Sequence, residues 1–430
     1  MSYPSSASSS ISSPASSSTR SPHICIVGGG FGGLYTALYL QKYRHLRRSR
    51  ITLIEPKDRF LFTPMMYELI TDELKEWEIA PTYSSLLAGT NITWEQTCAE
   101  TLDLQAQAVH LASEKTISYD YLVVARGAVS RPVGIPGVEE HTLSFRSLND
   151  ALTLKARLSQ LVRAQSLQPQ ISEAQPIHVT VIGGGASGVE LAGKISDYLG
   201  SPARITLVER GSTILQPFEK GLRRVGERAL ERRQVSVLTE TSVLEVRADS
   251  ITLQMGQEAQ VLPSQLTLWA VGVQPQPWLG MQKVEHNEQG QRLTQRSLQL
   301  IGHDNVFVLG DGADVRGPNH EPAPNTAQAA FQAASRVAAN LGALTQGKRP
   351  KPFNYLHLGD MVTLGVGDAG LWSFGIAIGG RFAALCRRGV YIFRMPTRRH
   401  QKKVARRALG ELGRAVLFPW KKRRRPSYES

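Results

Sequence analysis

The chain has 430 residues, enough for two or three domains with hydrophobic cores of their own. Its formal net charge of +14 resides in residues 381–430, which hold 16 Lys and Arg against two acids, while the other residues balance. The three cysteines are far apart and form no CxxC pair, which argues against a disulfide framework, a zinc site or a redox-active dithiol. We therefore predict no metal site.

The first 22 residues are dominated by serine and contain only one basic residue, Arg20. They lack the apolar segment that a secretory signal requires. We expect them to form a disordered tail.

The first informative segment is a glycine motif that follows an apolar strand, residues 23–27, and opens a helix, residues 34–41. Its key glycines are Gly28, Gly30 and Gly33. In such a motif the first glycine allows a tight turn, the second admits a diphosphate, and the third lets helix and strand pack closely. The next strand, residues 51–54, ends at Glu55, where a dinucleotide-binding unit needs a carboxylate for ribose hydroxyls.

A second copy of the motif lies in the middle of the chain, between a strand at residues 177–182 and a helix at residues 189–199. Its key glycines are Gly183, Gly185 and Gly188. The following strand, residues 205–208, ends at Glu209. Two such units in one chain predict two dinucleotides, a tightly held flavin, FAD, and a nicotinamide co-substrate, NADH or NADPH. Glu209 favours NADH because a carboxylate repels a 2′-phosphate, whereas the adjacent Arg210 leaves NADPH open.

Three further apolar strands end in segments suited to close approach of a ligand. They end at Gly127, at Gly272, and at residues 310–313, which include Asp311. Because the third strand follows the complete second unit, we expect the chain to return to its first domain. The sequence thus predicts an α/β fold with two Rossmann-like domains, the second inserted in the first.

The predicted segments are residues 1–22 for the tail, 23–150 for the first part of the FAD-binding domain, 151–275 for the NAD(P)H-binding domain, 276–350 for the return to the FAD-binding domain, and 351–430 for a membrane-association region. Within the last segment, residues 361–380 have the length of a membrane span. They contain Asp368 and six glycines, so we expect them not to form a transmembrane helix.

The basic end of the chain predicts two amphipathic helices. The first apolar stripe consists of Phe382, Leu385, Cys386, Gly389, Val390 and Phe393, flanked by Arg381, Arg387, Arg388 and Arg394. The second consists of Val404, Ala408, Leu412, Ala415 and Val416, flanked by Lys402, Lys403, Arg406, Arg407 and Arg414, and a basic run follows at residues 421–425.

We interpret residues 381–425 as helices lying on a membrane surface, with apolar faces down and basic flanks against anionic lipid headgroups. The alternatives are packing of the stripes on the protein itself or on a second copy in a homodimer, and nucleic-acid binding by the basic run. Nothing else in the sequence indicates nucleic-acid readout, so we predict no such partner.

Together these segments resemble the type II NAD(P)H:quinone oxidoreductases over residues 23–420. The resemblance rests on both glycine motifs with their acids, on residues 122–127, 145–148, 269–275 and 308–311, and most specifically on Ala-Gln-x-Ala-x-Gln at residues 327–332. It implies a peripheral membrane flavoenzyme that passes electrons from NAD(P)H through FAD to a lipid quinone, without pumping protons. Within the family, the serine-rich leader and basic end most resemble demethylphylloquinone reductases of photosynthetic organisms, which implies a prenylated naphthoquinone, or otherwise a prenylated benzoquinone. The implied location is the cytoplasmic face of a cytoplasmic or thylakoid membrane.

The resemblance also implies roles for individual residues. Gln328 and Gln332, one helical turn apart, would lie by the flavin and present amides to a quinone, and Glu190 would couple nicotinamide binding to quinone reduction. The plain alternatives are two solvated glutamines and an acid that stabilises a helix start. Residues expected to hold FAD are Gly28, Gly30, Gly33, Glu55, Gly127, Asp311 and Gln328. Residues expected to hold NAD(P)H are Gly183, Gly185, Gly188, Glu209 and Gly272.

One residue departs from the family pattern. Arg126 stands where the family usually has threonine, and it either reaches a cofactor phosphate or points outward. Two other functions remain open: a soluble flavoprotein reductase that serves an electron-transfer protein, and a redox-sensing regulator that binds FAD and NAD(P)H without turnover.

Overall fold

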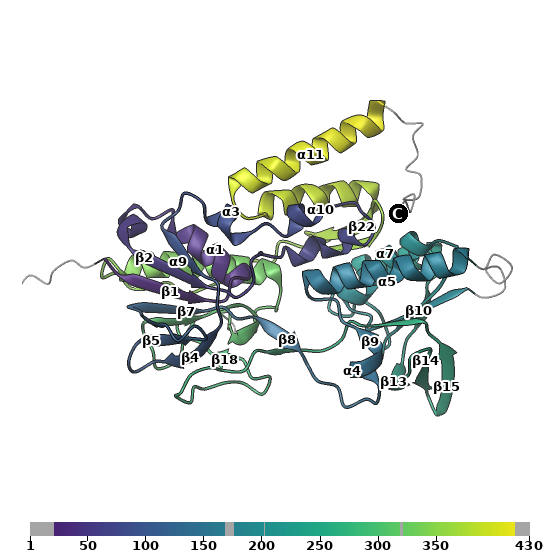
Figure 1. The fold of residues 1–430 in the computed structure, drawn as a ribbon, viewed down its shortest axis with the longest axis horizontal. Helices are drawn as coiled ribbons and strands as arrows, with labels where there is room; N and C mark the ends of the chain where they lie inside the picture. The colour runs from purple at the N-terminus through teal and green to yellow at the C-terminus, as the bar shows by residue number, and fades with distance from the viewer. Residues whose placement is uncertain (1–20, 168–175, 202, 319–320, 418–430) are drawn as a thin grey trace, which may run out of the picture.

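The computed structural model describes residues 21–167, 176–201, 203–318 and 321–417 (Figure 1). All but the last two residues of the predicted serine-rich tail, and the basic run at residues 421–425, lie outside the described residues. The same holds for the side chains of Leu412, Arg414, Ala415 and Val416.

The first domain is built on a five-stranded parallel sheet. Its strands, in spatial order, are β19 (Val306–Val308), β7 (Tyr121–Val124), β1 (His23–Val27), β2 (Arg50–Ile54) and β3 (Ile92–Glu95). Helices α1 (Phe31–Leu40) and α9 (Ala327–Leu344) pack on each other beside this sheet. Continuous apolar strands such as β1, buried at every position, are what a parallel sheet covered on both faces requires.

The second domain repeats this arrangement. Its sheet has the order β12 (Ser236–Leu238), β11 (Ala203–Val208), β10 (Ile177–Ile182), β16 (Leu266–Trp269) and β9 (Thr142–Leu143). Its helices are α5 (Leu148–Ser166), α7 (Ala186–Leu199) and α8 (Lys220–Arg232). A three-stranded antiparallel sheet accompanies each domain, β4 (Ala99–Asp103), β5 (Ala108–Leu111) and β6 (Thr116–Ser118) in the first, and β13 (Thr241–Val246), β14 (Ser250–Met255) and β15 (Glu258–Pro263) in the second.

The edge strands show how the chain passes between the domains. Strand β19, which follows the second domain in sequence, completes the first sheet, and β9, which precedes residue 151, completes the second. The two crossings run together as an antiparallel ribbon of β8 (Ala128–Ser130) and β17 (Val273–Pro275). The second Rossmann-like unit is therefore inserted in the first.

Short elements complete the two domains. They are η1 (Arg44–Arg48), η2 (Thr63–Leu69), α2 (Glu76–Ile79), α3 (Tyr83–Leu87), α4 (Val138–His141), β18 (Arg292–Leu293), η3 (Gly310–Gly312) and β20 (Ala313–Asp314).

The segment that has the length of a membrane span forms strands instead. β21 (Asp360–Gly365), β22 (Asp368–Ser373) and β23 (Ile376–Gly380) make an antiparallel sheet that packs on α7 and α8. At Gly193 of α7 a side chain would meet the carbonyl oxygen of Leu364 at 2.5 Å, so glycine permits this contact. Among the described residues, no helix combines the length and apolar character needed to cross a bilayer.

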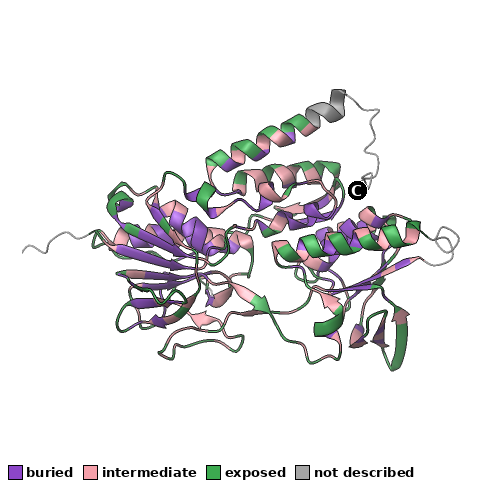
Figure 2. Cartoon of the chain, viewed as in Figure 1, coloured by how far each residue is buried: buried purple, intermediate pink, exposed green. Residues whose placement is uncertain are grey.

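Helix α10 (Arg381–Arg394) carries the predicted apolar stripe on its outer side. Phe382, Leu385, Val390 and Phe393 are exposed (Figure 2). The flanking arginines differ from the prediction, because Arg387 is only 3% exposed and lies on the inner side of the helix. Arg388 is also engaged, in an ion pair of 2.9 Å with Glu411.

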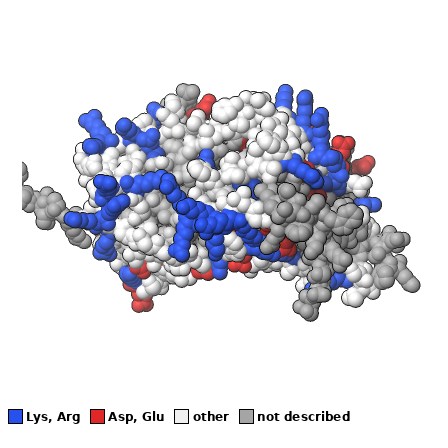
Figure 3. All heavy atoms as spheres, turned by 90° about the horizontal axis from the view of Figure 1, so that it is seen from above, with Lys and Arg blue, Asp and Glu red and all other residues white. Residues whose placement is uncertain are grey.

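Helix α11 (Arg398–Leu417) packs on the protein through the apolar residues that the sequence assigned to a membrane. Val404 and Ala408 are buried in the protein, and Arg407 forms an ion pair with the buried Glu78 of α2. For these residues the packing alternative is correct, since they are buried on a helix whose His400 and Arg407 bond to Glu78 of α2. The outer side of α11 carries the exposed basic residues Lys402, Lys403 and Arg406. Figure 3 shows Lys and Arg side chains gathered in a band across the face of the protein seen from above.

The packing of α11 predicts a difference between two substitutions. Val404→Asp should lower the free energy of unfolding by about 3 kcal/mol, because it places an unpaired charge in a fully buried position. Leu409→Asp, at a position 67% exposed on the same helix, should change it by less than about 0.5 kcal/mol. Urea unfolding of both variants tests this, and equal effects would contradict the packing of α11.

Candidate active site

The first glycine motif forms a turn that only glycine fits. Gly28 has a φ of 100°, and a Cβ there would lie 2.4 Å from the carbonyl oxygen of Ala125. A Cβ on Gly33 would lie 1.8 Å from the carbonyl oxygen of Gly28. These two contacts bring the start of α1 against β1 and β7, as the motif predicts.

The surroundings of Gly30 differ from those of Gly28 and Gly33. A Cβ there would meet no protein atom within 4 Å, so the turn is open on that side. Gly30 also precedes α1, whose first N–H groups receive no side-chain cap. An open turn beside uncapped helix N–H groups fits the diphosphate of a dinucleotide. Glu55 lies at the rim and accepts hydrogen bonds from the N–H groups of Gly29, at 2.7 Å, and Lys57, at 3.1 Å.

The second glycine motif reproduces this geometry. Gly183 has a φ of 108°, a Cβ on Gly188 would lie 1.7 Å from the carbonyl oxygen of Gly183, and one on Gly185 would meet no protein atom within 4 Å. Glu209 accepts hydrogen bonds from the N–H groups of Gly184 and Gly211, both at 2.6 Å. Arg210, between them, is exposed. The two halves of the chain thus present two equivalent dinucleotide cradles.

The other predicted cofactor residues lie at the ends of the strands beside each cradle. Gly127 follows β7 with a φ of 70°, and Gly272 follows β16 with a φ of 78°. Asp311 lies in η3, lining a small cavity that also contacts the start of α9. Burial raises the pKa of Asp311, and the nearby guanidinium of Arg146 opposes that shift.

Gln328 and Gln332 lie on the first turns of α9, but their amides are engaged. Gln328 accepts a hydrogen bond from the N–H of Leu358, at 2.9 Å, and donates one to the carbonyl of Gly359, at 3.1 Å. Gln332 bonds both the N–H and the carbonyl of Leu356, at 3.0 and 2.8 Å. Two amides one turn apart therefore clasp the extended segment before β21, where the sequence had suggested direct contact with a quinone.

Glu190, in the first turns of α7, is buried at the junction of three parts of the chain. Its Oε1 accepts a hydrogen bond from the N–H of Thr363 in β21, at 2.8 Å, and lies 3.6 Å from the Nη2 of Arg387 in α10. On the third side is η2 of the first domain, with Tyr67 and Glu68. Burial raises the pKa of Glu190 to about 7, although Arg387 acts to lower it. Near neutral pH this carboxyl is therefore populated both with and without its proton.

Sequence reasoning missed two members of this cluster, Glu68 and Arg387. Arg387 forms an ion pair with Glu68, and both side chains are buried. A helical wheel could have indicated that Arg387 points inward, because Ala383, Arg387 and Tyr391 recur on the side of the helix opposite the apolar stripe. Glu68 lies within an irregular stretch, residues 56–81, that has no periodicity, so nothing in the sequence indicated its role.

In the structure the side chain of Arg126 bonds to the protein's own main chain. Its Nη1 donates a hydrogen bond of 2.6 Å to the carbonyl of Pro277, and Gln276 donates one of 2.8 Å to the carbonyl of Arg126. Arg126 thus braces the β8–β17 crossing where the family threonine would stand.

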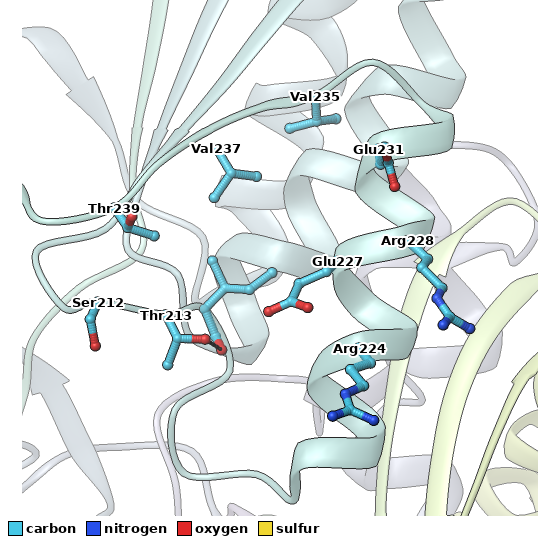
Figure 4. Close-up of a pocket in the computed structure, with 10 residues that line it drawn as sticks. Ser212, Thr213, Arg224, Glu227, Arg228, Glu231, Val235, Val237 and Thr239 are labelled. Atoms are coloured by element: carbon cyan, nitrogen blue, oxygen red, sulfur yellow. Dashed lines mark hydrogen bonds between the residues drawn. The ribbon is translucent and has the colours of Figure 1, made fainter.

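A hollow of about 580 Å³ lies in the second domain between α8 and the loop after Glu209 (Figure 4). Glu227 points from α8 toward Thr213, and Arg224 and Arg228 lie along the same helix. None of the sequence-predicted site residues lines this hollow.

Comparisons with known proteins agree with this geometry. The profile of the pyridine nucleotide-disulphide oxidoreductase family matches residues 22–334. The chain is 39% identical over 386 residues to demethylphylloquinone reductase NdbB of Synechocystis sp., covering 88% of this chain and 94% of that protein. It is 33% identical over 420 residues to the alternative NAD(P)H-ubiquinone oxidoreductase C1 of Arabidopsis thaliana, covering 90% of this chain and 80% of that protein.

The chain belongs to the type II NAD(P)H:quinone oxidoreductases, within the pyridine nucleotide-disulphide oxidoreductase family. The predicted resemblance is confirmed, and with it an FAD-dependent enzyme that transfers electrons from NAD(P)H to a quinone. Among solved structures, NDH2 of Plasmodium falciparum in complex with NADH has a TM-score of 0.81 at 18% identity, covering 94% of this chain and 100% of that one, and so shares its fold. The disulfide chemistry in the broader family's name does not apply, because Cys25, Cys98 and Cys386 are all unpaired and far apart in the sequence.

The glycine geometry predicts two different outcomes for two small substitutions. Gly33→Ala should prevent folding of the first domain or remove its flavin, since its methyl group would overlap a backbone oxygen. Gly30→Ala should leave folding intact and weaken FAD binding at least tenfold, because its methyl group would fill only the open side of the turn. Flavin content and circular dichroism of both purified variants measure this. Normal flavin content in both would contradict the assignment of the cradle.

Proposed function

We propose that this enzyme reduces a prenylated naphthoquinone with electrons from NADH at a membrane surface. The similarity to demethylphylloquinone reductase NdbB supports the naphthoquinone, with a prenylated benzoquinone as the second candidate. The chemical assignment rests on the position and the protonation of Glu190. It is a buried carboxyl that titrates near neutrality where the nicotinamide-side helix α7, the flavin domain and the C-terminal helix meet.

NADH is the preferred donor in this proposal. Both oxygens of Glu209 accept main-chain N–H groups, which holds its negative charge at the rim where a 2′-phosphate would lie. Glu55 has the equivalent pair of bonds in the flavin cradle. Arg210 is exposed and leaves Glu209 without a counter-charge among its hydrogen-bond partners.

Bound FAD supplies the chemistry that accepts a hydride from the nicotinamide and passes electrons to a quinone. The chain would hold it with Gly28, Gly30, Gly33, Glu55, Gly127, Asp311 and the segment clasped by Gln328, and would hold the nicotinamide dinucleotide with Gly183, Gly185, Gly188, Glu209 and Gly272. We assign Gln328 and Gln332 the task of fixing residues 356–359 beside the site. Glu190 would hold a proton for the quinone oxygens, since a quinol gains two protons with its two electrons.

Helix α10 is the proposed membrane contact. Its stripe of Phe382, Leu385, Val390 and Phe393 is exposed, whereas Val404 and Ala408 of the α11 stripe are buried. The basic outer side of α11 supplies attraction to anionic headgroups. We place the enzyme on the cytoplasmic face of a cytoplasmic or thylakoid membrane.

Anaerobic reduction of the purified protein tests the proposed function. NADH should bleach the flavin at least tenfold faster than NADPH at equal concentration, and a short-chain naphthoquinone should then restore the absorbance faster than a benzoquinone. Bleaching without recovery would favour a reductase of an electron-transfer protein or a redox-sensing regulator. Absence of bleaching would contradict the nicotinamide assignment.

The assignment of α10 predicts a loss of vesicle binding in Phe382→Ser/Phe393→Ser. Each exposed phenylalanine is expected to stabilise insertion by about 1.5 kcal/mol or more, so the double variant should bind phosphatidylglycerol vesicles at least 100-fold more weakly. Leu409→Ser on α11 is the matched control and should bind as the unmodified protein does. If the double variant dissociates a dimer and still binds vesicles, the stripe is a contact between two copies instead.

A further inference from the structure

Two charged residues from outside the nicotinamide-binding domain face the carboxyl group of Glu190. Arg387 comes from α10 and Glu68 from η2, and the three side chains are each less than 10% exposed. Arg387 Nη1 is paired with Glu68, its Nη2 donates to the carbonyl of Pro64, and the same Nη2 lies 3.6 Å from Glu190. One guanidinium therefore faces two buried carboxyl groups.

The charge balance of this cluster depends on Glu190. With Glu68 and Glu190 both ionised, the cluster has a net charge of −1, and with Glu190 protonated it is neutral. Burial disfavours the net charge, because the charged form loses its hydration. The proton of Glu190 thus neutralises the cluster.

The surrounding groups do not remove this imbalance. Tyr67 of η2 and Tyr391 of α10 also face Glu190, and burial raises the pKa of both phenols, that of Tyr391 to about 12, so both stay neutral. β21 contributes an N–H group, from Thr363. On α7, Lys194 also acts on Glu68, but it is already paired with Glu73.

Glu68 keeps its negative charge in this setting. Burial opposes its ionisation, but Arg387 and Lys194 together lower its pKa. Burial also opposes the charge of Arg387, yet Glu68 and Glu190 raise its pKa. Among the described residues, Oε2 of Glu68 and Nε of Arg387 are buried without a hydrogen-bond partner.

We infer that Glu68 and Arg387 are positioning residues for Glu190: Glu68 holds the guanidinium of Arg387 beside the carboxyl group of Glu190 at the meeting point of the two domains, and the charges of this pair control its protonation. This inference rests on the proposed role of Glu190 in quinone reduction. It also gives α10 a second role. Its outer side carries the exposed stripe, and its inner side reaches the site through Arg387.

The test is an infrared titration of the FAD-loaded enzyme between pH 5 and pH 9. The carbonyl band of the protonated Glu190 is identified by its loss in Glu190→Gln. In Glu68→Gln the negative charge next to Arg387 is gone, so the midpoint of this band should move by about one pH unit toward acid. In Glu68→Gln/Arg387→Gln, which removes one charge of each sign, the midpoint should lie at least one pH unit above that of Glu68→Gln, because Glu190 has lost its cation.

Asp197→Asn is the control for a purely structural effect. Asp197 lies on the same helix, α7, and its ion pair with Arg233, at 2.9 Å, lies away from Glu190. This variant should unfold at lower temperature and keep the midpoint of the unmodified enzyme. Midpoints that do not move in Glu68→Gln and in the double variant would overturn the inference, as would an equal shift in Asp197→Asn.

The kinetics of the two half-reactions separate this inference from the proposed function. The pH dependence of flavin reoxidation by a short-chain naphthoquinone should follow the infrared midpoint in each variant, while the rate of flavin reduction by NADH should change less than threefold. Infrared shifts without any quinone reoxidation in the unmodified enzyme would sustain the positioning role and refute the proposed function.

Discussion

The rest of the molecule depends on one constraint: in each domain a helix packs closely against the sheet at a glycine turn. In each domain the third glycine of the motif lies so near the carbonyl of the first that no side chain fits between them. The same turns leave the second glycine open and the helix N–H groups uncapped. Tight packing on one side thereby creates space for a diphosphate on the other.

Duplication of this unit explains the two-domain architecture of the chain. Four strands have the same order in both sheets, whereas the fifth is the last in sequence of the first sheet, β19, and the first in sequence of the second, β9. The ribbon of β8 and β17 carries the chain across and back. Arg126 braces that crossing through Pro277. The buried Glu190 lies at the junction of the domains, in contact with three parts of the chain.

The C-terminal region joins this junction to the surface. The sheet β21–β23 packs on α7, and α10 lies over that sheet with its apolar stripe outward and Arg387 inward. Helix α11 then covers α2 through Val404, His400 and Arg407. The two basic, amphipathic helices therefore differ: α10 exposes its apolar stripe, and α11 packs apolar residues on the protein. Each helix can bury only one of its faces.

The sequence by itself determined both glycine motifs, the carboxylates Glu55 and Glu209 that follow them, the insertion of the second unit in the first and the family of the enzyme, because these depend on local spacing of glycines, acids and apolar residues. It also indicated Glu190, though not what surrounds it. Only the tertiary structure decided that Arg387 points inward to Glu68, that α11 packs on the protein, and that Gln328 and Gln332 bind main chain. Each of these contacts joins residues that lie from 24 to 329 positions apart in the sequence. A helical wheel shows which residues share a face of a helix, but not which neighbouring element covers that face.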